Sequence, residues 1–323
     1  MQIEDATVTT DSLVRESFDA EQRAALEPWF TNSDLPVFGL VNLPETVKGA
    51  MFARYSRYQG TLRQMVLDEF APDMDAAAAA SFDGAEGDRA RTLYERIFLG
   101  YGDDSVAQLG GAHVAMEWVS NVLTKVVQRG RLAAYLEQST RYIAYDAPMG
   151  GVTIGGNDAP GYRYYRNPEL GPAYEETMDF LFSTYSQSLP KVIDWVASEY
   201  PAADGEDVAA HARAVKAKAL DLMRGLLPAA SLSHMGMFGS GQAYENLLLH
   251  LFASPLPEAQ KYGELLLAEL QKVIPSFVQR VERPDRGGRW IDYLRSLRTN
   301  SNQWADRLGI GEPQDDEIGR AHV

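Results

Sequence analysis

The segment 129–142, which reads RGRLAAYLEQSTRY, holds the residues of this chain best suited to bind a phosphorylated small molecule. Its guanidinium and aliphatic hydroxyl groups belong to Arg129, Arg131, Ser139, Thr140 and Arg141. Arginine is permanently charged and presents planar donors that bind a phosphate bidentately, and hydroxyls and backbone N–H groups can complete the cradle. The segment therefore predicts an anion site. The alternative is a solvated, salt-bridged helix end, because spacing alone does not separate the two.

Two further residues of the segment affect how such a site would work. Gly130 weakens a helix between its neighbouring arginines, because glycine costs about 1 kcal/mol against alanine in a helix interior. If the chain opens there, both guanidinium groups can turn the same way. Glu137 is the one acid of the segment. It either pairs with an arginine or accepts a hydrogen bond from a neutral ligand group, such as a ribose hydroxyl or a base N–H.

The elements around the segment are predicted from apolar periodicity. Val114, Trp118, Val122 and Val126 recur at four-residue steps, which predicts an amphipathic helix that ends at the segment. The alternation in 141–145 predicts a strand that leaves it. Elsewhere we expect an extended segment over 35–43, and helices over 51–70 with a break at Gly60, 206–227, 242–252 and 257–274.

Three other stretches have a distinctive composition. Residues 73–88 are of low complexity and are expected to form a surface loop or a weak helix. The long loop 148–167 can cover a pocket, and its tyrosines are expected to anchor it to the core, with stacking on a planar ring as the alternative. The basic stretch 283–298 predicts a solvated helix, or alternatively a pocket wall or a subunit contact.

The composition excludes several classes of function. The chain has 323 residues, 45% of them hydrophobic, which is enough to bury a large core without staples. It has no cysteine, which excludes a thiolate nucleophile and disulfides. The five histidines show no metal-ligand spacing on one helix, so we expect no metal site.

Charge and hydropathy limit the partners. The formal net charge of −15 repels nucleic acid and anionic membrane surfaces, so a phosphate-bearing partner is expected to be a small molecule. No apolar run approaches the roughly twenty residues that span a bilayer, and the acidic first residues lack the apolar centre of a signal peptide. These patterns predict a cytoplasmic protein.

The motif in 129–142 also resembles a known signature. Arg-Gly-Arg, seven residues and a serine, closed by Glu-Gln-Ser-Thr-Arg-Tyr, is similar to the Arg-His-Arg, seven residues, Ser motif of the flavin-dependent thymidylate synthases. Weaker matches follow in the family's order over roughly residues 50 to 280: Ala53 to Ser56, Asp104 to Val106, Met223 to Pro228 and Glu258 to Gln260.

The resemblance implies an architecture and a reaction. It implies an α+β, helix-rich fold with a small antiparallel sheet, and a homotetramer whose active sites are shared between subunits. We place an N-terminal extension at 1–34, the synthase-like domain at 35–300 and a tail at 301–323. The implied reaction is methylation of C5 of a uridine nucleotide, dUMP to dTMP, with FAD as cofactor and NADPH and methylenetetrahydrofolate as co-substrates.

The resemblance also implies site residues. The nucleotide set is Arg129, Glu137, Gln138, Ser139, Thr140, Arg141 and Arg224. The flavin set is Ser105, Arg129 and Arg131. Gly130 replaces the middle histidine of the motif, and Ala243, Glu245 and Ser254 stand where the family reads the base. Two alternatives therefore stay open: a flavin enzyme that acts on another pyrimidine nucleotide, and a nucleotide-binding relative without catalysis.

Overall fold

The central element of the fold is a four-stranded antiparallel sheet. The computed structural model describes residues 13–43, 45–70, 108, 110–154, 157–158 and 161–310. Within them the strand order is β2-β3-β7-β4. The strands are β2 (Val37–Leu40), β3 (Gly111–Ser120), β4 (Ala133–Glu137) and β7 (Leu232–Ser240).

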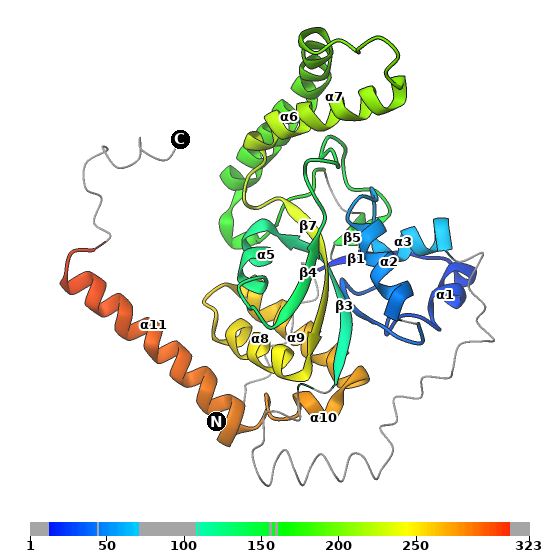
Figure 1. Ribbon diagram of the computed structural model, residues 1–323. Coiled ribbons are helices and arrows are strands. Elements are labelled where there is room, and N and C mark those ends of the chain that lie inside the picture. Colours follow the sequence, from blue (N-terminus) through cyan, green and yellow to red (C-terminus); the bar gives the residue numbers. More distant parts are fainter. Residues whose placement is uncertain are drawn as a thin grey trace.

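The two faces of this sheet are covered by different helices (Figure 1). Successive residues of a strand point to opposite faces, so Val114 and Met116 of β3 pack in one cluster and Ala115 in another. The first face packs on α5 (Asn121–Val127), α8 (Gly241–Ala253) and α9 (Pro257–Val273). The second packs on α1 (Ala20–Leu26), α2 (Glu45–Tyr55), α3 (Leu62–Met65) and the π-helical turn Val66–Phe70.

A pair of long helices extends from the sheet, at the top of Figure 1. α6 (Pro172–Glu199) and α7 (Val208–Met223) share a separate apolar cluster, built on residues such as Phe182, Tyr185 and Leu220. A 3-10 turn, Pro168–Leu170, precedes α6, and another, Arg224–Leu226, follows α7 and leads back toward β7. This connection places the end of α7 beside the sheet.

The remaining described elements are a small sheet and the C-terminal helices. β1 (Val14–Glu16), β5 (Val152–Ile154) and β6 (Asn157–Asp158) form an antiparallel sheet in the order β1-β5-β6. α10 (Pro275–Val278), a π-helical turn (Pro284–Gly288) and α11 (Arg289–Arg307) follow α9. None of the residues in α11 is buried, and none of the described helices is long and apolar enough to cross a membrane.

The helix predicted before the motif and the strand predicted after it are both wrong. The predicted helix from Val114 is strand β3 up to Ser120, and only Asn121–Val127 is helical. A four-residue apolar step is also a multiple of the strand period of two, so the same spacing fits either element. The predicted strand 141–145 is an irregular turn, and the strand of this region is β4, which ends at Glu137.

Several other predictions are confirmed. The sheet and the helices establish the α+β class, and α7, α8 and α9 lie within or close to their predicted ranges. Tyr164 anchors the loop 148–167 to the core, where it is 2% exposed. No sequence pattern predicted helix α6. Residues 73–88 lie outside the described residues.

Close packing between β7 and α2 makes Gly236 sensitive to substitution. A Cβ at this position would lie 2.7 Å from the Phe52 ring, inside the core. We expect Gly236→Ala to lower the free energy of unfolding by about 1–3 kcal/mol, because the ring must leave its position. Gly49→Ala is the control, since nothing lies within 4 Å of its Cβ in helix α2, and it should be neutral or stabilising by about 0.5–1 kcal/mol. Urea denaturation measures both, and equal midpoints for the two variants would contradict the expectation.

Candidate functional site

The end of the motif forms a tight turn after strand β4. The amide N–H of Gln138 donates to the His234 carbonyl at 2.8 Å, which continues the pairing with β7. The chain then turns, because the amides of Tyr142 and Ile143 both donate to the Ser139 carbonyl, at 3.0 and 3.2 Å. This turn exposes the Arg141 side chain and leaves the Ser139 and Thr140 side chains half-buried.

The turn is held against the end of helix α2. The amide of Ser139 donates to the Ser56 carbonyl at 3.5 Å, and the Gln138 side-chain amide donates to the Tyr58 carbonyl at 2.8 Å. The guanidinium of Arg57 lies 5.5 Å from the centre of the Tyr142 ring. The Ala53–Ser56 segment and the motif, some eighty residues apart in sequence, are therefore neighbours.

The end of α7 brings a third segment to the same place. Asp221 lies between two arginines, with its Oδ1 atom 3.4 Å from Arg141 and 3.1 Å from Arg224. These distances define ion pairs, but Oδ1 has no partner of hydrogen-bond geometry among the described residues. The carboxylate thus holds the two guanidiniums near each other without taking up their N–H groups. We call Arg57, Ser139, Thr140, Arg141 and Arg224 the motif-turn cluster.

The other two arginines of the motif lie at the opposite end of β4. Arg131 lines an open groove of about 440 Å³ at the edge of the sheet. The groove is also lined by Gln108, Gly110, Gly111, the start of β4 and the end of β7 with Phe238 and Ser240. Arg129 lies near helix α8, since burial and then the charges of Arg129 and Arg298 lower the pKa of His250. Arg129 and Arg131 are exposed, and neither has an ion-pair partner within the part of the chain that the structure describes.

The predicted single cluster of arginines is therefore divided in two within one chain. Ala133 pairs with Gly239 and Glu137 with Met235, so β4 is fully extended between the two groups. Its five residues span roughly 15 Å at about 3.3 Å per residue. A strand cannot bring its two ends together, and both arginine groups keep donors that an anion can use.

The remaining predicted residues play distinct structural parts. Glu137 accepts from Lys125 at 2.9 Å and Gln128 at 2.7 Å, so its observed partners lie at α5 and are not the motif arginines. Gln138 is buried, and both ends of its side-chain amide are engaged, with Tyr58 and Arg163. Ser105 lies outside the described residues.

The core between strand β3 and helices α2 and α3 contains a buried carboxylate. Glu117 of β3 accepts through Oε1 from the Tyr55 hydroxyl at 2.8 Å and the Leu62 amide at 2.7 Å. Its Oε2 has no partner among the described residues. Burial, followed by repulsion from Glu16, raises the pKa of Glu117 to about 8, while Arg63 acts in the opposite direction. This shift favours the protonated form of the Glu117 carboxyl at neutral pH.

The neighbouring charges form a buried ion pair. Arg63 lies 2.6 Å from Glu16, and both side chains are almost fully buried. Arg63 also donates to the Asn32 and Leu35 carbonyls, at 3.1 and 2.8 Å, and stacks 4.1 Å from the centre of the Phe38 ring. This arginine joins β1, α3 and the segment before β2 through one side chain.

Sequence reasoning missed several of these residues. They are Arg57, Arg63, Glu117, Arg163, Asp221 and His234. Only the Asp221–Arg224 pair had a local signal, because residues three apart on a helix are neighbours. The others are far apart in sequence and meet through tertiary packing. Among the described residues, no group of three or more histidines or acids could hold a metal ion.

Comparison with known proteins identifies the family. The model of the family "Thymidylate synthase complementing protein" matches residues 52–276, which is more than half of the chain. The chain belongs to this family, which confirms the resemblance seen in the motif.

Relatives and one solved structure are similar to the chain over different lengths. A "UPF0159 protein" of Chlamydia muridarum is 39% identical over 90% of this chain and 55% of its own length. A UPF0159 protein of Chlamydia pneumoniae is 41% identical over 92% and 56%. The chain spans about half the length of these relatives. The crystal structure of thymidylate synthase X from Helicobacter pylori with FAD and dUMP covers 60% of this chain and 86% of its own, with a TM-score of 0.37 and 14% identity.

Proposed function

We propose that the chain binds a uridine nucleotide, with the phosphate held by the motif-turn cluster. One observation supports this most: Asp221 sets Arg141 and Arg224 side by side without using their N–H groups. Asp221 is one carboxylate for two guanidiniums, and Arg57 adds a further positive charge at the Tyr142 ring, so the cluster has surplus positive charge. The Ser139 and Thr140 hydroxyls add donors, and Glu137 offers a carboxylate to the sugar. Gln138 holds the turn from behind.

The groove at the start of β4 is proposed to hold FAD. Arg131 and the neighbouring Arg129 supply charge for a pyrophosphate, and Phe238, which is 44% exposed, supplies an aromatic face. When bound, reduced FAD supplies the hydride for methylation of dUMP to dTMP, with NADPH as reductant and methylenetetrahydrofolate as carbon source. The residues of the chain bind and orient these molecules.

The two arginine groups lie at opposite ends of β4, and the groove beside Arg131 is open. We propose that they meet between copies, the groove of one chain facing the motif-turn cluster of another, in a homotetramer. The Thymidylate synthase complementing protein family and the open form of the groove support this arrangement. A cytoplasmic location is proposed on the same basis, since these small molecules are cytoplasmic.

The nucleotide proposal predicts a loss of binding on removal of the paired arginines. We expect Arg141→Gln combined with Arg224→Gln to raise the dissociation constant for dUMP by about 10–100-fold, since each charged hydrogen bond contributes roughly 1.5–3 kcal/mol and neighbouring losses do not add fully. Calorimetric titration of the FAD-loaded protein measures this. Arg283→Gln is the matched control, because Arg283 pairs with Asp285 away from the cluster.

Three results would decide the proposal. An absorption spectrum without bound flavin, and no uptake of added FAD, would remove the catalytic part. Unchanged dUMP affinity in the double variant would remove the motif-turn cluster from the site. Reduced affinity in the Arg283→Gln control would show that the loss reflects net charge alone.

A second candidate function is supported by the residues at the positions where the family is expected to recognise the base. Glu245 is paired with Arg280 at 2.5 Å, and Ser254 is a buried residue whose hydroxyl accepts from the Leu256 amide. Both therefore have structural partners. A flavin enzyme acting on another pyrimidine nucleotide, or a relative that only binds nucleotides, is the alternative. Oxidation of the reduced flavoprotein in the presence of dUMP, UMP or dCMP distinguishes these functions.

A further inference from the structure

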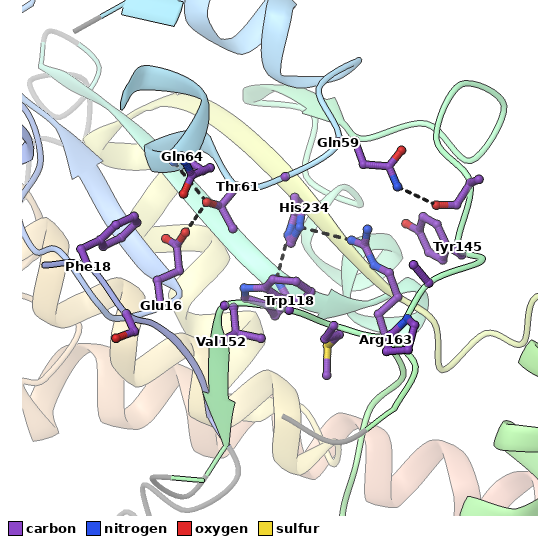
Figure 2. Close-up of a pocket in the computed structure, with 18 residues that line it drawn as sticks. Glu16, Phe18, Gln59, Thr61, Gln64, Trp118, Tyr145, Val152, Arg163 and His234 are labelled. Atoms are coloured by element: carbon purple, nitrogen blue, oxygen red, sulfur yellow. Dashed lines mark hydrogen bonds between the residues drawn. The ribbon is translucent and has the colours of Figure 1, made fainter. Parts of the chain in front are cut away.

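A second pocket, of about 290 Å³, is lined by Arg163, which donates to the Gln138 side chain. It is enclosed by strand β1, the turn between α2 and α3, and the loop 144–152. Its polar walls include Trp118, Tyr145, Arg163 and His234 (Figure 2). None of these residues belongs to the sets that the motif predicts.

Within the described part of the chain, the pocket lacks a hydrogen-bond acceptor between the side chains of His234 and Arg163. The Trp118 amide donates to Nδ1 of His234 at 3.1 Å, and Nη2 of Arg163 lies 3.2 Å from Nε2. Burial, and then Arg163, lower the pKa of His234 well below its ordinary value, so the ring is neutral and carries one proton. Because a backbone amide can only donate, Nδ1 is the acceptor and the proton lies on Nε2. Two N–H donors, from His234 and Arg163, therefore face each other.

Arg163 is held rigidly at the wall of the pocket. Its Nε donates to the Leu232 carbonyl at 2.9 Å and Nη2 donates to the Gln138 side chain at 3.1 Å. Its guanidinium lies 4.1 Å from the centre of the Tyr145 ring and 5.3 Å from that of Trp118. Nη1 has no partner among the described residues. The positive charge is thus positioned by the protein and retains free donors.

Two more buried donors at the pocket are unpartnered. Trp118 is 9% exposed and Tyr145 1% exposed, and neither the indole N–H nor the hydroxyl has a hydrogen-bond partner among the described residues. Leaving a buried polar group unpaired costs roughly 1–3 kcal/mol. Trp118 also has a φ of 56° beside the irregularity in β3, a conformation that costs a non-glycine residue about 1–3 kcal/mol. These costs are concentrated at one pocket.

The charges around the pocket favour an anion. Glu16 is the acid that lines it, and its carboxylate is engaged by Arg63 and by the Thr61 hydroxyl. Arg163 has no such carboxylate partner among the described residues. The pocket walls therefore present donors without a matching acceptor.

We propose that this pocket binds the oxyanion group of a small molecule, a phosphate or a carboxylate, with Arg163 and Nε2 of His234 as the principal donors. An oxyanion oxygen beside these two groups can accept from both and gives each N–H an acceptor. The Tyr145 hydroxyl and the Trp118 indole N–H provide further hydrogen bonds. Figure 2 shows His234, Arg163 and Tyr145 directed toward one another. This site does not depend on the proposed nucleotide function.

Titration of the whole 323-residue chain tests the proposal. The probes are inorganic phosphate and benzoate, and the readouts are tryptophan fluorescence, to which Trp118 contributes, and the thermal unfolding midpoint. We expect a saturable response to at least one probe. Tyr145→Phe removes a hydroxyl that has no partner among the described residues, so the fold should be retained, and it should weaken binding about 5–10-fold. Arg163→Gln should weaken it at least about 10-fold.

Two controls assign the response to this pocket. Tyr185→Phe removes a buried hydroxyl that does not line the pocket but lies by the Tyr145 backbone, so it controls for altered packing around Tyr145 and should bind as the wild type does. In the Arg141→Gln, Arg224→Gln background, which removes phosphate binding at the proposed nucleotide site, the response that remains should still be weakened by Tyr145→Phe, which separates the two sites. A response to phosphate alone or benzoate alone identifies the source of the oxyanion. No saturable response to either probe, or wild-type binding by Tyr145→Phe and Arg163→Gln, would overturn the proposal.

Discussion

Replacement of Arg63 with methionine is expected to lower the free energy of unfolding by about 3–5 kcal/mol. The substitution leaves Glu16 charged and without its partner at a site where both side chains are almost fully buried. It also removes the donors to the Asn32 and Leu35 carbonyls. Methionine fills much of the volume, so the loss reflects the unpaired charge and acceptors more than a cavity.

Arg54→Met provides the matched comparison. Arg54 forms a similar ion pair with Glu69, 2.5 Å apart, but its side chain is 44% exposed and its partner's 33%. Water screens such a pair, so the expected loss is at most about 1 kcal/mol. Chemical denaturation of both variants, followed by circular dichroism, measures the difference. Equal losses would show that burial of the Arg63–Glu16 pair has no special effect on stability.

The second large effect is a fall in stability as pH rises from about 6.5 to 8. The folded protein keeps a proton on Glu117, whose pKa is raised from 4.5 to about 8, whereas the unfolded chain has released it. The native state therefore binds more protons, so alkali favours unfolding, by up to about 1.4 kcal/mol per pH unit. The loss is half developed at the folded pKa and complete only well above it, where both states are ionised.

His234 explains why the window begins near 6.5. Its folded pKa is lowered, so the unfolded chain binds the extra proton below 6.5, and stability there rises with pH. This change opposes that of Glu117 at acid pH and vanishes once the unfolded histidine is neutral. Above pH 6.5 the ionisation of Glu117 lowers the stability without this opposing contribution from His234.

Denaturation curves at a series of pH values test this expectation. Glu117→Gln keeps an acceptor for the Tyr55 hydroxyl and the Leu62 amide but cannot ionise, so its stability should be nearly constant over the same window. A wild-type profile that is flat or rising between 6.5 and 8 would be inconsistent with a protonated Glu117. A variant profile as steep as that of the wild type would assign the proton to another group.

Local sequence patterns were sufficient for part of the fold and for the family. Helices α7, α8 and α9 have caps, proline boundaries and apolar periodicity within a single stretch of chain, so these signals needed no distant partner. The motif in 129–142 is likewise contiguous, and the family model confirms the resemblance that it carries. Its assignment as a nucleotide site stays a prediction.

Long-range packing was required for the remaining features. The four-residue apolar step from Val114 suits a helix and a strand equally, and pairing with β2 and β7 selects the strand. The motif arginines fall into two groups because β4 is extended by its pairing with β7. Neither choice has a local signal, since both depend on hydrogen bonds to residues about 70 to 130 positions away.

The buried charges illustrate the same limit most clearly. Glu16, Arg63 and Glu117 come from three distant parts of the chain, and each alone reads as an ordinary surface residue. Burial changes their chemistry, because a low-dielectric interior penalises charge and makes each group depend on its neighbours. The order of residues specifies which groups the protein has. Their protonation, pairing and unmet hydrogen bonds follow from the three-dimensional arrangement of the chain.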